Sequence, residues 1–134
     1  MEKIVIIGGV AAGATAAAKV RRLSTDAEIT ILEAGADISF ANCGLPYFIG
    51  GDIKSRSKLI LQSPESFNEA YQTAVHIHTK ATKIDRIKRV VYTENSRSGD
   101  KMQFEYTKLI LAQGGHQISA PSPSAGQDHV FQLW

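Results

Sequence analysis

Apolar residues in this chain fall into short runs separated by amphipathic or glycine-rich stretches. The run 3–7 is β-branched and ends at Gly8 and Gly9, which is typical of a strand buried on both faces of a parallel sheet. Residues 10–23 are alanine-rich and basic at their C-terminal end, which predicts a helix. A second apolar run, 27–33, predicts another buried strand. Together these segments predict a βαβ unit of the usual length of about 30 residues.

The pattern beyond this unit changes twice. Pro46 at an early helical position predicts a short helix that starts near Cys43, and Ser63 followed by Pro64 predicts the start of a second helix that ends near Gln72. The period then becomes two, which predicts short strands at 75–78, 81–87, 90–94 and 103–106, with a hairpin turn at 98–100. A last apolar run predicts one more strand over 108–112.

These elements predict an α/β fold, namely a Rossmann-like βαβ arrangement with a parallel sheet and an inserted antiparallel β-meander. The segment 119–126 is rich in serine and proline and has the composition of a linker. We therefore expect one domain over 1–118, and a linker with the start of a further domain over 119–134.

Composition excludes several classes of protein. A chain of 134 residues with 43% hydrophobic and 21% charged residues has the make-up of one globular domain. The net charge of +2 is too small to indicate nucleic-acid binding, and no apolar run is long enough to cross a membrane. The single cysteine excludes an internal disulfide or a CxxC pair. No signal peptide precedes the first strand, so we expect a cytoplasmic protein with neither nucleic acid nor membrane as a partner.

The glycine-rich turn after the first strand is the main candidate for chemistry. Gly8 permits a tight turn, Gly13 permits close helix–strand packing, and the helix N-terminus between them attracts a pyrophosphate. Glu33 follows Gly13 by 20 residues, where a carboxylate can accept hydrogen bonds from a ribose. Val10 replaces the middle glycine of the usual pattern. Nucleotide binding is favoured over the alternative, in which the glycines serve packing alone.

Cys43 and two histidines are further candidates. A lone cysteine is ordinarily a small buried side chain, but Cys43 stands at the expected start of a helix, where a thiolate is favoured, and on the nucleotide side of the sheet. His76 and His78 would share one face of a predicted strand. Two ligands without a third do not make a metal site, so we predict no metal and a solvated strand face.

Two segments of the chain carry a family resemblance: Ile4 to Ala14, and Ser39 to Tyr47 with the sequence SFANCGLPY. Together they resemble the single-cysteine branch of the FAD-dependent pyridine nucleotide-disulfide oxidoreductases, which includes coenzyme A-disulfide reductases, NADH oxidases and NADH peroxidases. The resemblance implies FAD as cofactor, NAD(P)H as reductant in the intact enzyme, coenzyme A or its disulfide as partner, and a homodimeric intact enzyme. It covers essentially the whole chain, but only the first part of such an enzyme. Residues 1–118 would be a partial FAD-binding domain, and 119–134 a linker to a nicotinamide-binding domain.

The resemblance also assigns roles to individual residues. Cys43 would be the redox nucleophile that forms a mixed disulfide with coenzyme A. The FAD-binding positions would be Gly8, Gly9, Val10, Ala11, Ala12, Gly13, Glu33, Ala81, Ala112 and Gly114. The coenzyme A channel would be lined by Thr15, Lys19, Arg22, Ser39 and Asn42. For Lys19 and Arg22 the alternative is a solvated basic helix end.

Three functions remain open at this point. Oxidases and peroxidases of this branch usually carry a histidine inside the glycine turn, where this chain has Ala11, and this favours a disulfide reductase over an NADH oxidase. A non-catalytic nucleotide-binding remnant is the third reading, because the chain contains no second dinucleotide motif. We expect the chain on its own to be inactive with NAD(P)H, since hydride transfer needs a domain that places the nicotinamide on the flavin.

Overall fold

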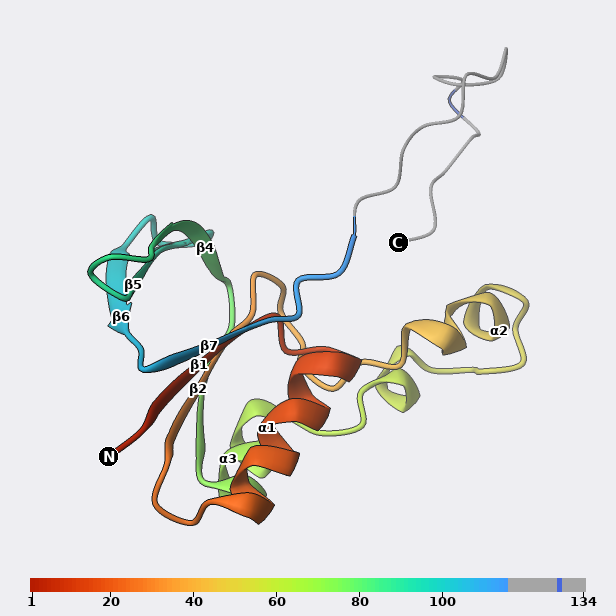
Figure 1. Cartoon of the computed structure of the whole chain (residues 1–134). Helices are drawn as coiled ribbons and strands as arrows, with labels where there is room; N and C mark the ends of the chain where they lie inside the picture. Colours follow the sequence, from red (N-terminus) through yellow and green to blue (C-terminus); the bar gives the residue numbers. More distant parts are fainter. Residues whose placement is uncertain (116–127, 129–134) are drawn as a thin grey trace.

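The computed structural model describes residues 1–115 and 128. Two sheets organise the chain: a four-stranded parallel sheet in the order β3-β2-β1-β7, and a three-stranded antiparallel sheet in the order β4-β5-β6 (Figure 1). The parallel strands are β1 (Lys3–Ile7), β2 (Glu28–Leu32), β3 (Thr73–His76) and β7 (Lys108–Leu111). This arrangement confirms the predicted α/β fold with a parallel sheet and an inserted meander.

Helices cover one face of the parallel sheet. They are α1 (Ala11–Leu23) and α3 (Pro64–Tyr71), and Ser63 caps α3 by accepting a hydrogen bond from the N–H of Ser66. Alternate residues of β1, Ile4 and Ile6, point into this layer, where the small side chains of α1 let the helix lie close to the sheet. The buried residues of this core are Ile4, Ile6, Ala14, Ala17, Ala27, Ile29, Ile31, Ile38 and Phe67.

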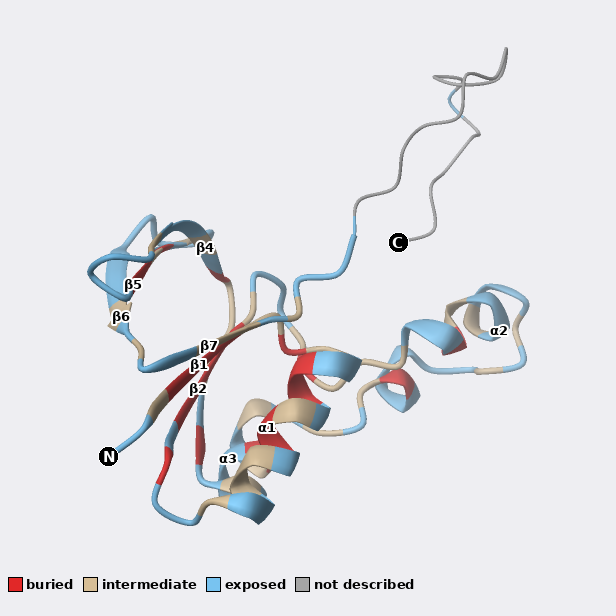
Figure 2. Cartoon of the chain, viewed as in Figure 1, coloured by how far each residue is buried: buried red, intermediate tan, exposed pale blue. Residues whose placement is uncertain are grey.

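The meander covers the other face of the parallel sheet. Its strands are β4 (Thr79–Asp85), β5 (Val90–Asn95) and β6 (Lys101–Glu105). Val5 and Leu32 from the parallel sheet pack with Val91 of the meander to form a second, smaller core. Figure 2 shows that buried residues concentrate in β1 and β2, whereas much of the meander is exposed. The parallel sheet is therefore the framework that the other elements cover.

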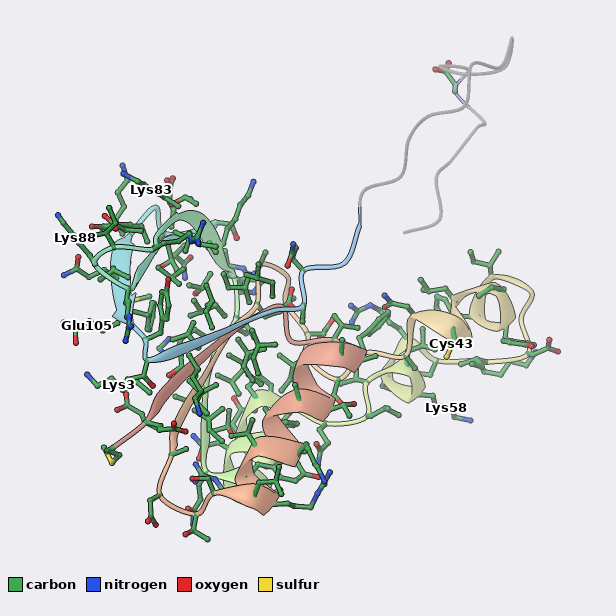
Figure 3. All side chains as sticks on the ribbon, in the orientation of Figure 1. Lys3, Cys43, Lys58, Lys83, Lys88 and Glu105 are labelled. Carbon is green, nitrogen blue, oxygen red and sulfur yellow. The ribbon has the colours of Figure 1, made fainter. Side chains whose placement is uncertain are left out.

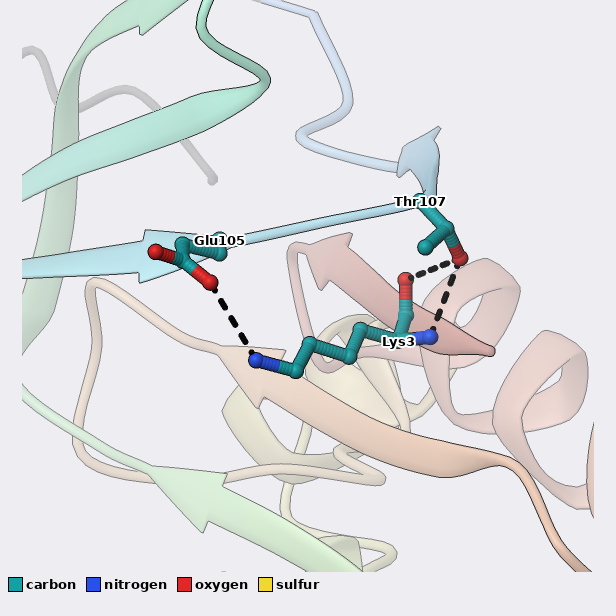
Figure 4. Close-up of polar contacts among 3 residues, drawn as sticks. All are labelled: Lys3, Glu105 and Thr107. Carbon is teal, nitrogen blue, oxygen red and sulfur yellow. Dashed lines mark hydrogen bonds and ion pairs between the residues drawn. The ribbon is translucent and has the colours of Figure 1, made fainter. Parts of the chain in front are cut away.

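A polar junction ties the end of the meander to the first strand (Figure 4). The hydroxyl of Thr107 donates a hydrogen bond to the carbonyl of Lys3 and accepts one from the backbone N–H of Lys3, both at 3.0 Å. The ammonium of Lys3 lies 3.2 Å from a carboxylate oxygen of Glu105. These contacts join residues about a hundred positions apart and fix where β7 enters the sheet.

Between β2 and α3 the chain leaves the body in an excursion, which we define as residues 42–59. It contains the 3-10 helix η1 (Asn42–Gly44), the short helix α2 (Leu45–Ile49) and the 3-10 helix η2 (Arg56–Leu59), and it extends to one side of the sheet (Figure 1). The helix expected near Cys43 is thus η1 followed by α2. The pattern did not predict η2.

Some predicted boundaries were wrong. The strand predicted at 75–78 is β3 over 73–76, and the strand predicted at 81–87 is β4 over 79–85. The reason is a pair of turns with left-handed residues, His78 at φ 52° and Arg89 at φ 54°. His78 lies in the first turn, so His76 and His78 do not share a strand face.

Two further expectations concern the domain boundary and membrane-crossing segments. The predicted domain boundary at 118 and the linker over 119–126 lie outside the described residues. Within the described residues, no helix combines the length and the apolarity that crossing a membrane requires.

Candidate functional site

The turn between β1 and α1 is packed too tightly for any residue but glycine at two positions. Gly8 has φ 99°, and a Cβ there would lie 2.3 Å from the carbonyl oxygen of Ala112. A Cβ at Gly13 would lie 1.8 Å from the carbonyl oxygen of Gly8. The first turn of α1 is therefore pressed against the end of β1, as the sequence predicted from Gly8 and Gly13.

The N-terminus of α1 is open to an anion. Val10 occupies the N-cap position without a side-chain hydrogen bond, and the first turn contains no acidic residue. Ala11 and Ala12 are exposed. The N–H groups of the first helical turn have no partner within a helix, so they and the helix dipole favour a negatively charged group at this position.

Glu33 follows β2 and lies directly beside the glycine turn. One carboxylate oxygen accepts a hydrogen bond from the N–H of Gly9, and the other accepts one from the N–H of Gly35, each at 2.7 Å. These two bonds fix the orientation of the carboxylate. A carboxylate has about four acceptor positions, so roughly two remain for a ligand with a pair of hydroxyl groups.

The other predicted cofactor positions lie around the same end of the sheet. The N–H of Ala112 donates to the carbonyl of Ile7 at 2.8 Å, and Ala112 is in close approach to Gly8. Gly114 follows, exposed and with φ 75°. The N–H of Thr79 at the start of β4 donates to the carbonyl of Glu33 at 2.8 Å, which places Ala81 two residues farther along. These positions thus lie near the carboxyl ends of the parallel strands.

Cys43 is exposed on η1, which excludes the buried alternative considered from the sequence (Figure 3). The base of its excursion is closed by two backbone hydrogen bonds, from Ala41 N–H to the carbonyl of Leu59 at 2.8 Å and from Leu61 N–H to the carbonyl of Ser39 at 3.1 Å. The N–H of Ser39 also donates to the carbonyl of Gly9 at 2.9 Å. Ser39 therefore lies beside the glycine turn. Because four residues span at most about 15 Å, the Cys43 backbone lies within about 15 Å of Ser39.

A side-chain clamp, which we define as Asp37, Phe40 and Arg56, supports the base of the excursion. The guanidinium of Arg56 forms an ion pair with the carboxylate of Asp37 and lies 5.4 Å from the centre of the Phe40 ring. Leu59 next to this clamp is buried. Sequence reasoning missed these residues, because an ion pair between positions 19 residues apart leaves no periodic signal.

The predicted coenzyme A positions form two groups. Ser39 is half-buried and Asn42 is exposed, and both lie on the segment that leads to Cys43. Thr15, Lys19 and Arg22 are exposed and share one face of α1, since they are spaced by four and three residues. Arg22 stands near the end of α1, about 16 Å along the axis from Ala11. A ligand that contacts both groups has to be elongated.

Arg21, next to Arg22, has a different role that the sequence did not reveal. Its guanidinium donates hydrogen bonds to five backbone carbonyls, at distances from 2.6 to 3.2 Å. The acceptors are Ser24, Thr25, Ala27, Tyr71 and Gln72. Arg21 therefore joins the end of α1 to the start of β2 and the end of α3.

In the part of the chain that the structure describes, the histidines and acidic residues do not form a metal centre. Among residues 1–115 and 128, no three His, Cys, Asp or Glu side chains are grouped as metal ligands. The His76 ring packs edge-on against Phe104, with centroids 4.9 Å apart, and burial lowers the pKa of His76 below its usual value. His76 is therefore part of the contact between β3 and the meander.

Comparison with known proteins places these features in a family. Residues 2–133 match the family model for pyridine nucleotide-disulphide oxidoreductases. The chain is 39% identical over 133 residues to the coenzyme A disulfide reductase of Staphylococcus haemolyticus (strain JCSC1435), a match that covers 99% of this chain and 30% of that relative.

Solved structures agree with the sequence match. Reduced Bacillus anthracis CoADR-RHD is similar with a TM-score of 0.87 and 39% identity, over 92% of this chain and 22% of that one. The water-forming NADH oxidase from Lactobacillus brevis is similar with a TM-score of 0.84 and 26% identity, over 96% of this chain and 28% of that one. The chain thus spans less than a third of the length of these relatives.

Proposed function

The chain belongs to the pyridine nucleotide-disulphide oxidoreductase family, and on that premise we propose that it forms the FAD-binding part of a single-cysteine disulfide reductase. Its proposed substrate is coenzyme A disulfide, and its proposed nucleophile is the thiolate of Cys43. The observation that carries the proposal is the exposed Cys43 on a loop anchored to the glycine turn through the Ser39–Gly9 hydrogen bond.

The described residues fit FAD at the carboxyl end of the parallel sheet. The cradle at Gly8 and Gly13, which a Cβ would fill, and the open N-terminus of α1 suit its pyrophosphate. The oriented carboxylate of Glu33 suits the two hydroxyl groups of its adenosine ribose. When bound, FAD would supply a two-electron path from NAD(P)H to a disulfide.

The proposed step at Cys43 is thiol–disulfide exchange. The thiolate sulfur Sγ attacks one sulfur of coenzyme A disulfide, and a Cys43–coenzyme A disulfide forms as the original S–S bond breaks. The second coenzyme A leaves as a thiolate and takes a proton from water. No net oxidation occurs in this step, so the reductant is needed only to release the coenzyme A that remains on Cys43.

The elongated arrangement of polar residues supports coenzyme A as the ligand. Asn42 lies beside Cys43, where the thiol end of coenzyme A would be held. Lys19 and Arg22 lie on the exposed face of α1, where two cations suit phosphates. Coenzyme A is long and flexible, with its phosphates remote from its thiol, and therefore matches two separated groups of contacts.

The choice of a reductase over an NADH oxidase rests on Ala11 and on the comparisons. A methyl side chain at Ala11 cannot assist a cysteine sulfenic acid by proton transfer, as a histidine could. The curated coenzyme A disulfide reductase is 39% identical to the chain, against 26% for the solved NADH oxidase. Both facts support the reductase, with NAD(P)H oxidation belonging to the whole enzyme.

Intact-protein mass spectrometry tests the substrate assignment. Incubation of the native chain with coenzyme A disulfide should add one coenzyme A, and dithiothreitol should remove it. Cys43→Ser should give no adduct, and the chain contains no other cysteine to complicate the result. A small alkylating reagent serves as the control for exposure of the thiol. Rapid alkylation of Cys43 without any coenzyme A adduct would show that the substrate is wrong.

A further inference from the structure

The turn between β4 and β5 presents an isoleucine to solvent. Ile87 is 95% exposed, the highest value among the large apolar side chains of the described residues. Ile84, on the preceding strand, is 36% exposed and lines the same shallow hollow as Ile87. An isolated exposed apolar residue is common, so its surroundings decide its meaning.

Cations surround this isoleucine. Residues 83–89, which we call the basic tip, contain the exposed cations Lys83, Arg86, Lys88 and Arg89. With Asp85 as the sole acid, the basic tip carries a net charge of +3. The whole chain carries +2, one less than the tip alone, so the other residues together are net −1. Figure 3 shows Lys83 and Lys88 pointing outward from the meander.

The acids near the basic tip are already engaged. One oxygen of the Asp85 carboxylate accepts hydrogen bonds from the N–H of Ile87 at 3.1 Å and of Lys88 at 2.9 Å. The strand register places Glu105 two strands away at the same end of the meander, and Glu105 pairs with Lys3. These carboxylates therefore shape the scaffold, and the tip keeps its net charge of +3 with Asp85 counted. The ammonium of Lys83 also lies 5.8 Å from the centre of the Tyr92 ring.

The shape of the tip is fixed by the backbone. Asp85 pairs with Val90 across the hairpin, and the carbonyl of Arg89 accepts a hydrogen bond from Tyr106 N–H at 2.9 Å. Arg89 takes a left-handed conformation with φ 54°, which closes the turn. Ile87 is thus held at the end of an ordered hairpin, and its exposure follows from the fold.

We propose that the basic tip docks on an anionic lipid surface, with Ile87 entering the headgroup layer and the four cations facing lipid phosphates and carboxylates. Each lysine or arginine near an anionic membrane strengthens the electrostatic attraction of the protein to the lipid, and an aliphatic side chain buried in the headgroup layer strengthens binding further. A protein partner would need about 800 Å² on each side, more than a seven-residue tip offers. Single-stranded nucleic acid would find no aromatic side chain in the tip for stacking. The proposal departs from the expectation, drawn from composition, that the chain has no membrane partner, because a peripheral contact requires no membrane-crossing helix.

Vesicle co-sedimentation of the full chain tests the proposal. Vesicles of phosphatidylcholine with phosphatidylserine are compared with phosphatidylcholine alone, at about 0.01 M and about 1 M salt, where the Debye length falls from about 30 Å to about 3 Å. We expect binding to the anionic vesicles at low salt only. Arg86→Glu with Lys88→Glu should weaken binding at least 25-fold, since each lost cation costs about fivefold.

The matched control reverses the same charge at the opposite end of the meander. Arg97→Glu with Lys101→Glu also changes two exposed cations, which lie about 20 Å from the tip at the other end of the six-residue strand β5. Compared with the tip variant at about 0.1 M salt, where the Debye length is about 10 Å, it should weaken binding less than threefold. Ile87→Ser should weaken binding about tenfold without changing its salt dependence. Circular dichroism of each variant establishes that the meander is retained.

Three outcomes would overturn the proposal. One is equal binding to neutral and anionic vesicles, and another is equal loss in the tip variant and its control. The third is binding to duplex DNA that needs Arg86 and Lys88 but is unaffected by Ile87→Ser, which would assign the tip to nucleic acid.

An Ile87→Trp chain in a Trp134→Phe background adds an optical test. Its fluorescence should shift to shorter wavelength on anionic vesicles, and an unshifted spectrum in the bound state would exclude insertion.

Discussion

Replacing Arg21 tests whether this arginine stabilises the fold, in contrast to the neighbouring Arg22 of the proposed ligand site. All five N–H donors of the Arg21 guanidinium are used, and all five acceptors are backbone carbonyls. Tyr71 and Gln72 at the end of α3 lie 50 and 51 residues away in sequence. Arg21→Ala therefore removes the polar link between α1 and α3 in a single substitution.

The magnitude follows from the surroundings of the five bonds. Three of them, to Ser24, Ala27 and the carbonyl of Tyr71, are partly buried, and two are exposed. Exposed carbonyls regain water, so we count only the three partly buried bonds, at about 1 kcal/mol each after partial rehydration. We expect Arg21→Ala to lower the free energy of unfolding by about 3 kcal/mol, or Tm by about 10 °C. Arg21→Lys should recover only part of this, because an ammonium lacks the planar fork.

Urea unfolding followed by circular dichroism measures this loss, and Arg22→Ala is the matched control. Both variants remove one cation from adjacent positions near the end of α1, but Arg22 is exposed. Arg22→Ala should change the free energy of unfolding by less than about 0.5 kcal/mol, as is usual for surface substitutions. If both variants unfolded at the same urea concentration, the five-bond link would have no energetic role and the reasoning would be refuted.

Three further predictions concern the glycine turn, Glu33 and His76. Gly13→Ala should abolish measurable FAD binding and lower Tm, because its Cβ would lie 1.8 Å from a backbone oxygen that cannot rotate away. Gly115→Ala is the stability comparison, because a Cβ there would meet nothing within 4 Å and the backbone is not left-handed. Glu33→Gln should weaken FAD binding in calorimetry by about 1.5–3 kcal/mol, and unchanged affinity would exclude the ribose assignment. Burial lowers the folded-state pKa of His76, so the unfolded chain binds a proton more readily and stability falls as pH drops below about 6.5. His76→Leu should therefore flatten the change of the urea midpoint between pH 7.5 and pH 5 relative to the unsubstituted chain, and an unchanged slope would contradict the burial argument.

The parallel sheet could be predicted from the sequence because its signals are local. Strands β1, β2 and β7 are each one short apolar run, and the glycine turn joins β1 to α1 within a few residues. Strand β3 has no such run, and its bounds were predicted wrongly. Gly8 and Gly13 were predictable for the same reason, since steric demands of a turn act on the residues that form it. Glu33 was selected as a candidate by its distance of 20 residues from Gly13, and the structure adds that backbone N–H groups orient its carboxylate.

The features that the sequence did not reveal depend on contacts between distant residues or on single backbone conformations. Arg21 looked like any basic residue at a helix end, and its acceptors on α3 become neighbours only in the folded chain. Asp37 and Arg56 form their ion pair across the excursion in the same way. His78 and Arg89 lie in turns between strands and take left-handed conformations. Period-two patterns do not predict these, because alternation of side chains carries no information about φ at a single residue.

The same contacts explain how a loop could present the proposed nucleophile without being loose. In the proposed reaction Cys43 has to be exposed to meet a disulfide, yet an unconstrained loop would lose entropy each time a ligand ordered it. Backbone bonds at Ala41 and Leu61 close the base of the excursion, and the Arg56 ion pair with Asp37 holds its return segment. Much of the ordering of the loop is therefore completed when the chain folds. Because the loop is also bonded to Gly9, the proposed cofactor cradle and the proposed nucleophile are set relative to each other before either ligand arrives.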